Sequence, residues 1–184
     1  MMDKLRSNIY LVGPMGSGKT TIGQRLAKLL GMDFYDSDRQ LEAQTGASVN
    51  LIFDVEGESG FRVRETQMLE NLTSRSNVLL ATGGGAVLKQ ENRQLLSRTG
   101  LVVYLQISVP QQLHRLSRDR TRPLLQCEDR EKKLNDMAAA RNPLYEEIAD
   151  IVFPSLNRGP AIAARLLAGR IQSLRDRKTS DLAQ

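Results

Sequence analysis

Short apolar runs alternate with amphipathic segments along most of this chain. The runs are rich in β-branched, aromatic or leucine side chains, as buried strands are, and lie at residues 9–12, 32–35, 78–81, 101–107 and 151–153. Between them, apolar side chains recur at intervals of three and four residues, as on one face of a helix. This alternation predicts parallel strands joined by helices, and therefore an α/β fold with a central sheet of about five strands flanked by helices.

Helix signals are expected in five places. The first helix has apolar positions 22, 26, 29 and 30 and ends at Gly31, a residue that readily adopts the left-handed conformation of a helix end. Ser48 is expected to cap a second helix, and a third runs from about residue 59 to 72. A fourth begins near Pro110, and the last covers 161–174 with apolar positions 162, 166, 167 and 171. The polar residues after it, 175–184, are expected to fray.

Size and composition favour one domain. The 184 residues suffice for a continuous core, so we expect a single domain over residues 1–184. The single cysteine, Cys127, cannot form an internal disulfide, and no spacing typical of a zinc site is present. Nowhere do 18 apolar residues run together. We therefore expect a cytoplasmic monomer without a membrane partner.

The charge balance indicates anionic ligands but not nucleic acid. Lysine and arginine total 26 against 21 acidic residues, which gives a net charge of +5 and a field that favours anions. Nineteen of the basic residues are arginines, which suit bidentate contacts to carboxylates and phosphates, although solvated helix faces explain most of them. They are spread along the chain, and there is no tryptophan for base stacking, so we expect no nucleic-acid partner.

The most informative motif follows the first apolar run. Residues 13–20 read Gly-Pro-Met-Gly-Ser-Gly-Lys-Thr, a glycine-rich turn that opens a helix and directs several N–H groups at one phosphate. Lys19 would reach the β- and γ-phosphates of a nucleotide, and the Thr20 hydroxyl would bind its Mg²⁺. A purely structural turn is disfavoured, because it gains nothing from the Lys-Thr pair. The predicted ATP contacts here are Gly16, Ser17, Gly18, Lys19, Thr20 and Thr21.

Two further motifs follow the second and third apolar runs. Asp36 and Asp38 would face the crevice at the carboxyl end of the sheet, one supporting magnesium and the other accepting a proton. The alternative is a helix cap for the segment that begins at Arg39. Residues 83–85 are all glycine, which allows a ligand to lie directly on the backbone, although a structural turn is the alternative.

Residues 115–130 are different in character from the rest. Five arginines stand among acidic residues with few large apolar groups, which favours a mobile lid that closes over a nucleotide and excludes water. An ordinary charged surface loop is the alternative.

Together these motifs resemble the shikimate kinases over about residues 8–174. The resemblance rests on the phosphate loop and on five more motifs in the same order: Asp36-Ser37-Asp38, Gly60-Phe61-Arg62, Gly83-Gly84-Gly85, Arg122-Pro123-Leu124-Leu125 and Arg141-Asn142-Pro143-Leu144-Tyr145. It implies a three-layer P-loop NTPase fold with a lid. It also implies transfer of the γ-phosphoryl group of MgATP to the 3-hydroxyl of shikimate, on the route to chorismate and the aromatic amino acids.

The resemblance also assigns roles to single residues. It implies that Asp38 orients and deprotonates the shikimate hydroxyl, and that Arg62 and Arg141 hold the carboxylate. Gly84 and Gly85 would contact the ring. On the nucleotide side the resemblance implies Thr20 as the direct ligand of one Mg²⁺ per ATP, Asp36 as its support through water, Arg122 as a catalytic phosphate contact with Lys19, and Arg115 against the adenine.

Without the resemblance, Arg62 and Arg141 are interpreted as surface residues, and three other functions remain open. They are another small-metabolite kinase such as one for gluconate, a nucleoside monophosphate kinase and, from a different class, a nucleic-acid-linked ATPase.

Overall fold

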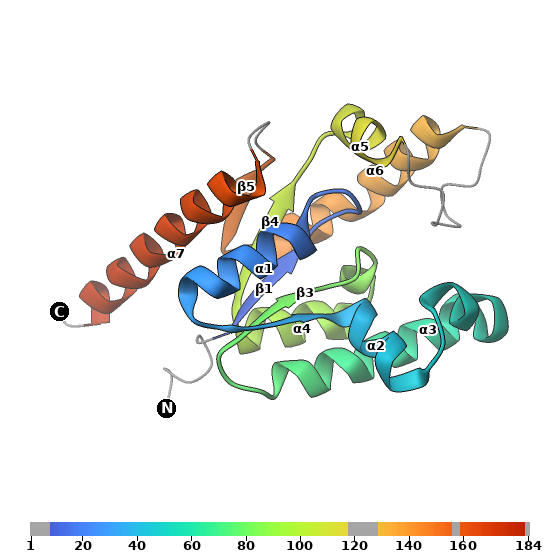
Figure 1. Cartoon of the computed structure of the whole chain (residues 1–184), viewed down its shortest axis with the longest axis horizontal. Coiled ribbons are helices and arrows are strands. Elements are labelled where there is room, and N and C mark those ends of the chain that lie inside the picture. The colour runs from blue at the N-terminus through green and yellow to red at the C-terminus, as the bar shows by residue number, and fades with distance from the viewer. Residues whose placement is uncertain (1–7, 118–128, 156–158, 183–184) are drawn as a thin grey trace.

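The computed structural model describes residues 8–117, 129–155 and 159–182. Within these residues five parallel strands form one sheet in the order β2-β3-β1-β4-β5 (Figure 1). The predicted strands are all confirmed to within a residue or so at their ends. They are β1 (Ile9–Val12), β2 (Asp33–Asp36), β3 (Val78–Ala81), β4 (Leu101–Gln106) and β5 (Ile151–Pro154).

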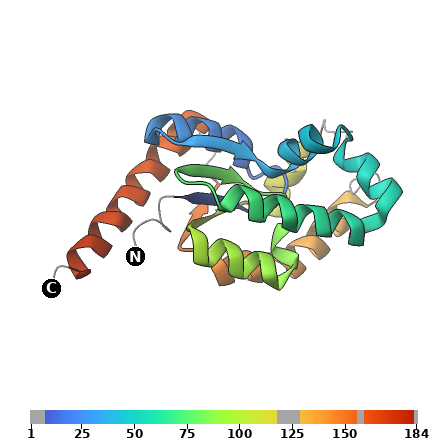
Figure 2. The ribbon, with the colours of Figure 1, turned by 90° about the horizontal axis from the view of Figure 1, so that it is seen from below.

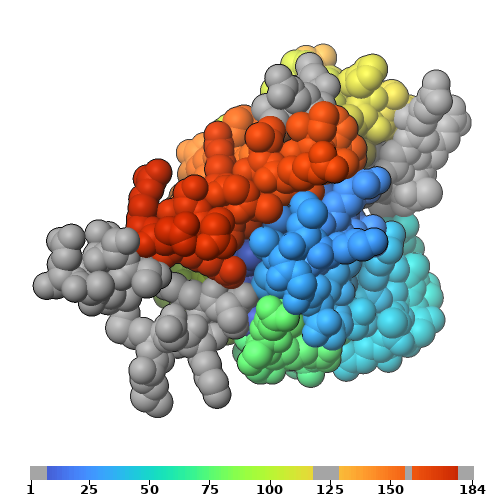
Figure 3. All heavy atoms as spheres, turned by 60° about the vertical axis from the view of Figure 1, so that its left-hand side comes forward, coloured from blue at the N-terminus to red at the C-terminus, as the bar shows by residue number. Residues whose placement is uncertain are grey.

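Helices cover both faces of this sheet. One face carries α1 (Lys19–Leu30) and α7 (Pro160–Leu182), which lie alongside each other at the surface (Figure 3). The other face carries α3 (Val49–Thr73), α4 (Gln90–Thr99) and α6 (Arg130–Ile148) (Figure 2). The predicted three-layer architecture is therefore confirmed. None of the helices in the described part of the chain combines the length and apolarity needed to cross a membrane.

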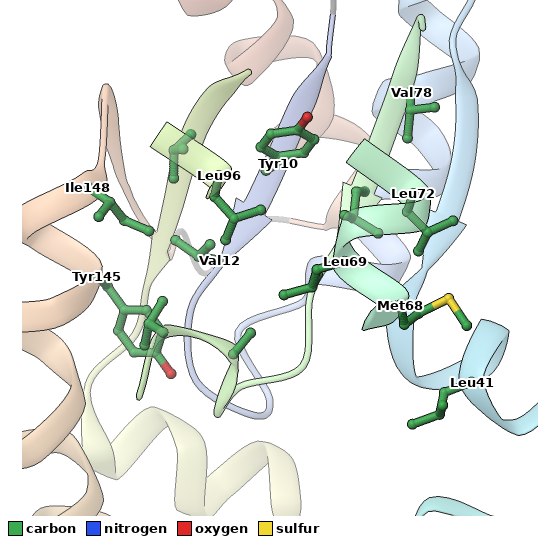
Figure 4. Close-up of a cluster of buried hydrophobic side chains, with 14 of the residues drawn as sticks. Tyr10, Val12, Leu41, Met68, Leu69, Leu72, Val78, Leu96, Tyr145 and Ile148 are labelled. Atoms are coloured by element: carbon green, nitrogen blue, oxygen red, sulfur yellow. The ribbon is translucent and has the colours of Figure 1, made fainter. Parts of the chain in front are cut away.

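Strand β1 is buried from both sides. Ile9 and Leu11 pack towards α1 and α7, whereas Tyr10 and Val12 belong to the cluster under α3, α4 and α6 (Figure 4). All four side chains are fully buried, as expected of a central parallel strand.

The register of the strands brings three motifs to one edge of the sheet. Asp36, the last residue of β2, pairs with Ala81, the last residue of β3, and Ala81 pairs with Leu11 of β1. Whatever follows these strands therefore leaves the sheet at the same level. The phosphate loop, the Asp36 motif and the glycine triplet meet there, as the strand pattern predicted.

Helix α3 contains a sharp break. Gly57 has φ 70° and ψ −179°, a conformation that is open almost only to glycine, so the helix divides into the two helices predicted there. Ser48 caps the first, because its hydroxyl accepts the Leu51 N–H at 3.2 Å. The break folds the two halves together, and Phe53 stacks on Phe61 with ring centroids 4.3 Å apart.

Three expectations about helices were wrong or incomplete. Fraying was expected from residue 175, but α7 continues to Leu182. Residues with good helix propensity and the Gln172–Asp176 hydrogen bond extend the helix. Ile162 and Leu166 are each 45% exposed, because α7 presents Ala163 and Ala164 to the core instead. The remaining short helices are α2 (Ser37–Thr45), η2 (Ala86–Leu88) and α5 (Val109–Leu116). Three helices, η2, α4 and α6, were not predicted.

The predicted lid lies mostly in residues 118–128, outside the described residues. Its two ends are described and lie together. Leu116 at the end of α5 packs against Leu134 of α6, and Arg130 Nη1 donates to the Leu116 carbonyl at 3.5 Å.

Candidate active site

A cavity of about 960 Å³ opens at the carboxyl end of the sheet. This volume lies at the upper end of the range of small-molecule sites. Every predicted site residue within the described ranges lines it, and Arg122 lies outside those ranges. The lining includes Gly16, Ser17, Gly18, Lys19, Thr20, Thr21, Asp36, Asp38, Arg62, Gly84, Gly85, Arg115 and Arg141.

The phosphate loop forms one wall of the cavity. Gly18 caps α1 in the left-handed conformation, so the helix begins at Lys19 with its first N–H groups directed at the loop. Ser17 is 2% exposed, and its hydroxyl has no hydrogen-bond partner among the described residues. Lys19 Nζ donates to the carbonyls of Gly13 and Pro14 at 2.6 and 2.9 Å. A buried hydroxyl without a partner and an ammonium folded onto the loop both fit a phosphate-binding site.

Thr20 and Asp36 form a direct pair between the loop and β2. The Thr20 hydroxyl donates to Asp36 Oδ2 at 2.7 Å, and Asp36 Oδ1 accepts the Arg39 N–H at 3.4 Å. Asp36 therefore caps α2, which agrees with the alternative interpretation of this motif. Asp36 also bonds Thr20, the predicted magnesium ligand. One hydroxyl beside one carboxylate is the sparse oxygen set with which Mg²⁺ is held when nucleotide phosphates and water supply its other ligands.

The glycine triplet lies at the centre of the cavity. A Cβ on Gly83 would stand 2.8 Å from both Asp38 Oδ1 and Glu65 Oε1, and a Cβ on Gly85 would collide with the Arg62 guanidinium. Gly84 faces the phosphate loop and Arg141. Gly83 and Gly85 thus pack against charged side chains that a Cβ would displace, whereas a Cβ on Gly84 would be in ordinary contact with its neighbours. Close packing of charged side chains accounts for Gly83 and Gly85, and the approach of a ligand to the triplet stays a prediction.

Arg62 is buried in an ion-pair network. Its guanidinium donates to Glu65 at 2.7 Å and to Glu58 at 3.0 Å, and Arg62 is only 9% exposed. The interpretation of Arg62 as a surface residue is therefore wrong. Burial raises the pKa of Glu65 above the usual glutamate value, although the neighbouring cations Arg62, Arg141 and Lys89 oppose this.

Glu65 is the main residue that sequence reasoning missed. It is 2% exposed, and its Oε1 has no hydrogen-bond partner in the described part of the chain. The sequence feature that could have indicated Glu65 is its position three residues after Arg62 in a helical segment, because side chains at that spacing are neighbours.

The other two predicted arginines also face the cavity. Arg141 reaches it from α6, with Nη1 3.9 Å from the place where a Cβ on Gly84 would lie, so the surface interpretation is wrong for Arg141 too. Arg115, at the end of α5, donates to the Gly16 carbonyl at 3.0 Å and to the Ser155 hydroxyl at 2.7 Å. Arg115 therefore lies beside the phosphate loop, and Arg141 beside the glycine triplet.

A phosphate loop on a parallel sheet, next to a polar acceptor pocket, defines a P-loop kinase. The family model described as Shikimate kinase matches residues 15–170. The shikimate kinase of Pasteurella multocida is 51% identical over 170 residues, which cover 92% of this chain and 97% of that one. The chain belongs to the shikimate kinase family.

Solved structures agree with this assignment. The shikimate kinase of Acinetobacter baumannii, solved in complex with shikimate, has a TM-score of 0.85 and 51% identity, covering 95% of this chain and 96% of that one. A gluconokinase from Sinorhizobium meliloti has a TM-score of 0.61 and 17% identity, covering 95% and 98%. The second likeness shows a common fold alone.

Proposed function

We propose that this chain transfers the γ-phosphoryl group of ATP to the 3-hydroxyl of shikimate, giving shikimate 3-phosphate and ADP. Membership of the shikimate kinase family supports the activity. The observation that carries the site assignment is the glycine triplet, which lies between the phosphate loop and three charged acceptor residues, Asp38, Arg62 and Arg141. Shikimate has one carboxylate and several ring hydroxyls, so it requires cations at one end and a carboxylate at the other.

On the nucleotide side, the loop N–H groups and Lys19 neutralise the β- and γ-phosphates. Lys19 exchanges its bonds to loop carbonyls for bonds to phosphate oxygens when ATP binds. Thr20 would hold one Mg²⁺ directly and Asp36 would support it through water; when bound, the ion would offset negative charge on the phosphates. Arg115 would lie against the adenine, and Arg122, outside the described residues, would be a phosphate contact.

On the acceptor side, Arg62 and Arg141 hold the shikimate carboxylate, while Gly84 and Gly85 lie against the ring. Asp38 orients the hydroxyl and accepts its proton as the hydroxyl oxygen bonds to the γ-phosphorus. The bond between that phosphorus and the bridging oxygen breaks, and ADP leaves with its electron pair. The protein supplies mainly position and charge, which is what phosphoryl transfer demands. We place these functions in one domain, residues 1–184, with a lid over 115–130.

A coupled assay of ADP release tests the proposal. Shikimate should stimulate ADP release from MgATP, whereas gluconate and a nucleoside monophosphate at the same concentration should leave it at the background rate. A chain that responded to gluconate or to the monophosphate, and not to shikimate, would contradict the assignment.

The role of Asp38 is tested by Asp38→Asn, which keeps the shape and removes the proton acceptor. We expect kcat to fall by about a hundredfold or more while the Kd of ATP stays within about threefold. Asp33→Asn, at the opposite end of β2, is the matched control. Loss of ATP affinity with kcat retained would place Asp38 on the nucleotide instead.

A further inference from the structure

A buried hydroxyl lies beneath the glycine triplet. Tyr145 of α6 is fully buried, and its ring belongs to the core cluster beside Ile148 (Figure 4). Its hydroxyl donates to the carbonyl of Gly84 at 2.5 Å. This bond joins α6 to the middle residue of a loop that is 61 residues away in sequence.

The same hydroxyl interacts electrostatically with a predicted substrate residue. Arg141 precedes Tyr145 by one helical turn, so the two side chains are neighbours on α6, and the Arg141 guanidinium opposes the rise in the pKa of the phenol. A hydroxyl has one proton and two lone pairs. Since the proton goes to the Gly84 carbonyl, the lone pairs of the oxygen remain available for attraction to the Arg141 guanidinium.

The ring of Tyr145 holds this atom in place. Tyr145 stacks on Tyr104 of β4, with ring centroids 5.0 Å apart. Burial raises the pKa of the Tyr145 phenol well above its ordinary value, and Arg141 opposes this only in part. The hydroxyl is therefore a neutral donor over the whole physiological pH range.

We propose that Tyr145 is a positioning residue for the acceptor, setting Arg141 and Gly84 at the spacing that the substrate carboxylate and ring require. The inference rests on the proposed function, because it takes Arg141 as the carboxylate contact. Tyr145 itself does not touch the reacting atoms. We expect its effect on binding of the acceptor, because Gly84 is the proposed ring contact and Arg141 the proposed carboxylate contact.

The test is Tyr145→Phe, which removes one oxygen and keeps the ring. We expect the KM for shikimate to rise about tenfold, the size expected for one lost hydrogen bond, while the KM for ATP stays within about twofold. Tyr104→Phe is the matched control. Tyr104 is equally buried and belongs to the same stack, but its hydroxyl bonds Asn142 Oδ1 at 3.2 Å and not the glycine loop.

Tyr104→Phe should leave the shikimate KM within about twofold of the parental value, and urea unfolding of both variants should show comparable midpoints. An unchanged shikimate KM in Tyr145→Phe would overturn the proposal. So would equal rises in both KM values, or the same rise in Tyr104→Phe, since each would indicate general loosening of the fold.

A double-mutant cycle tests the link to Arg141. If Tyr145 acts partly through Arg141, then Tyr145→Phe should raise the shikimate KM by clearly less than its tenfold factor in an Arg141→Ala background. If Tyr145→Phe raised the shikimate KM tenfold in both backgrounds, the claim that Tyr145 orients Arg141 would be overturned. A parental chain that released no ADP on addition of shikimate would overturn the proposed function itself, and this role with it.

Discussion

At the scale of single residues, Lys19 must change its bonds most when a nucleotide binds. Its ammonium lies against two loop carbonyls, and ATP offers it phosphate oxygens instead. We expect Lys19→Ala to lower kcat by about a hundredfold or more with the fold intact, because a preorganised charge on the phosphates is lost. Lys28→Ala, at an exposed position on the same helix, is the control. Near-parental turnover of the Lys19 variant in the ADP assay would remove the loop lysine from the mechanism.

Glu65 makes the stability of the chain depend on pH. Its pKa is raised in the folded state, so the folded chain holds this proton more tightly than the unfolded chain, where the ordinary value is 4.5. The contribution of Glu65 to the free energy of unfolding is then present below pH 4.5 and is lost as pH rises through the raised pKa. We expect the parental free energy of unfolding to fall relative to that of Glu65→Gln over this range, measured by urea unfolding.

The exposed Glu70→Gln, on the same helix, controls for loss of one negative charge. A parental chain that gained stability relative to Glu65→Gln as pH rose would contradict the account. That trend would mean that attraction to Arg62 outweighs burial.

The position of site residues beside strand ends could be predicted from the sequence. The position of those that enter the site through the packing of helices could not. Asp36 and the glycines directly follow strands, so the topology alone places them in the crevice. Arg62 and Arg141 lie in helices whose orientation is set by long-range contacts, and only the family resemblance suggested them. Tyr145 was quoted within a motif but was given no role, since its bond to Gly84 depends on how α6 packs. The roles given to the site residues, from the phosphate loop to Asp38, Arg115, Arg122 and Arg141, stay predictions.

At the scale of elements, the break in α3 shapes the acceptor wall. Gly57 lies at φ 70°, and a Cβ added to it would meet nothing within 4 Å, so Gly57→Ala tests backbone strain alone. We expect a loss of about 1–3 kcal/mol in the free energy of unfolding and a raised shikimate KM, because the break sets Phe61 and Arg62.

The control for this substitution is Gly169→Ala in α7, where a Cβ also meets nothing within 4 Å but the backbone is helical. We expect a gain of about 0.5–1 kcal/mol there, since alanine restricts the unfolded chain. Equal effects of the two substitutions in thermal or urea unfolding would contradict the strain at Gly57.

Elements with clear periodicity were predictable and polar ones were not. All five strands and α1 followed from apolar spacing. Helices α4 and α6 were missed, because their sequences are polar and only a few of their positions are buried. In α7 the predicted Leu167 and Ile171 are buried, but the same face also contains Ala163, Ala164 and Ala168, which a search for large apolar residues overlooks.

At the scale of the whole molecule, the sheet order explains why the site lies where it does. Strand β1 is central, and the phosphate loop after it lies beside the motifs that follow β2 and β3. The family and the fold inferred from the motifs are confirmed. A cytoplasmic monomer, the absence of a nucleic-acid partner and the lid over residues 115–130 stay predictions.

The most direct test is a crystal structure of the chain with shikimate, Mg²⁺ and a non-hydrolysable ATP analogue. The account predicts the shikimate carboxylate between Arg62 and Arg141, with the 3-hydroxyl within about 3 Å of the Asp38 carboxylate and pointing at the terminal phosphorus. Shikimate bound away from the glycine triplet, or with its carboxylate directed at Asp38, would contradict it.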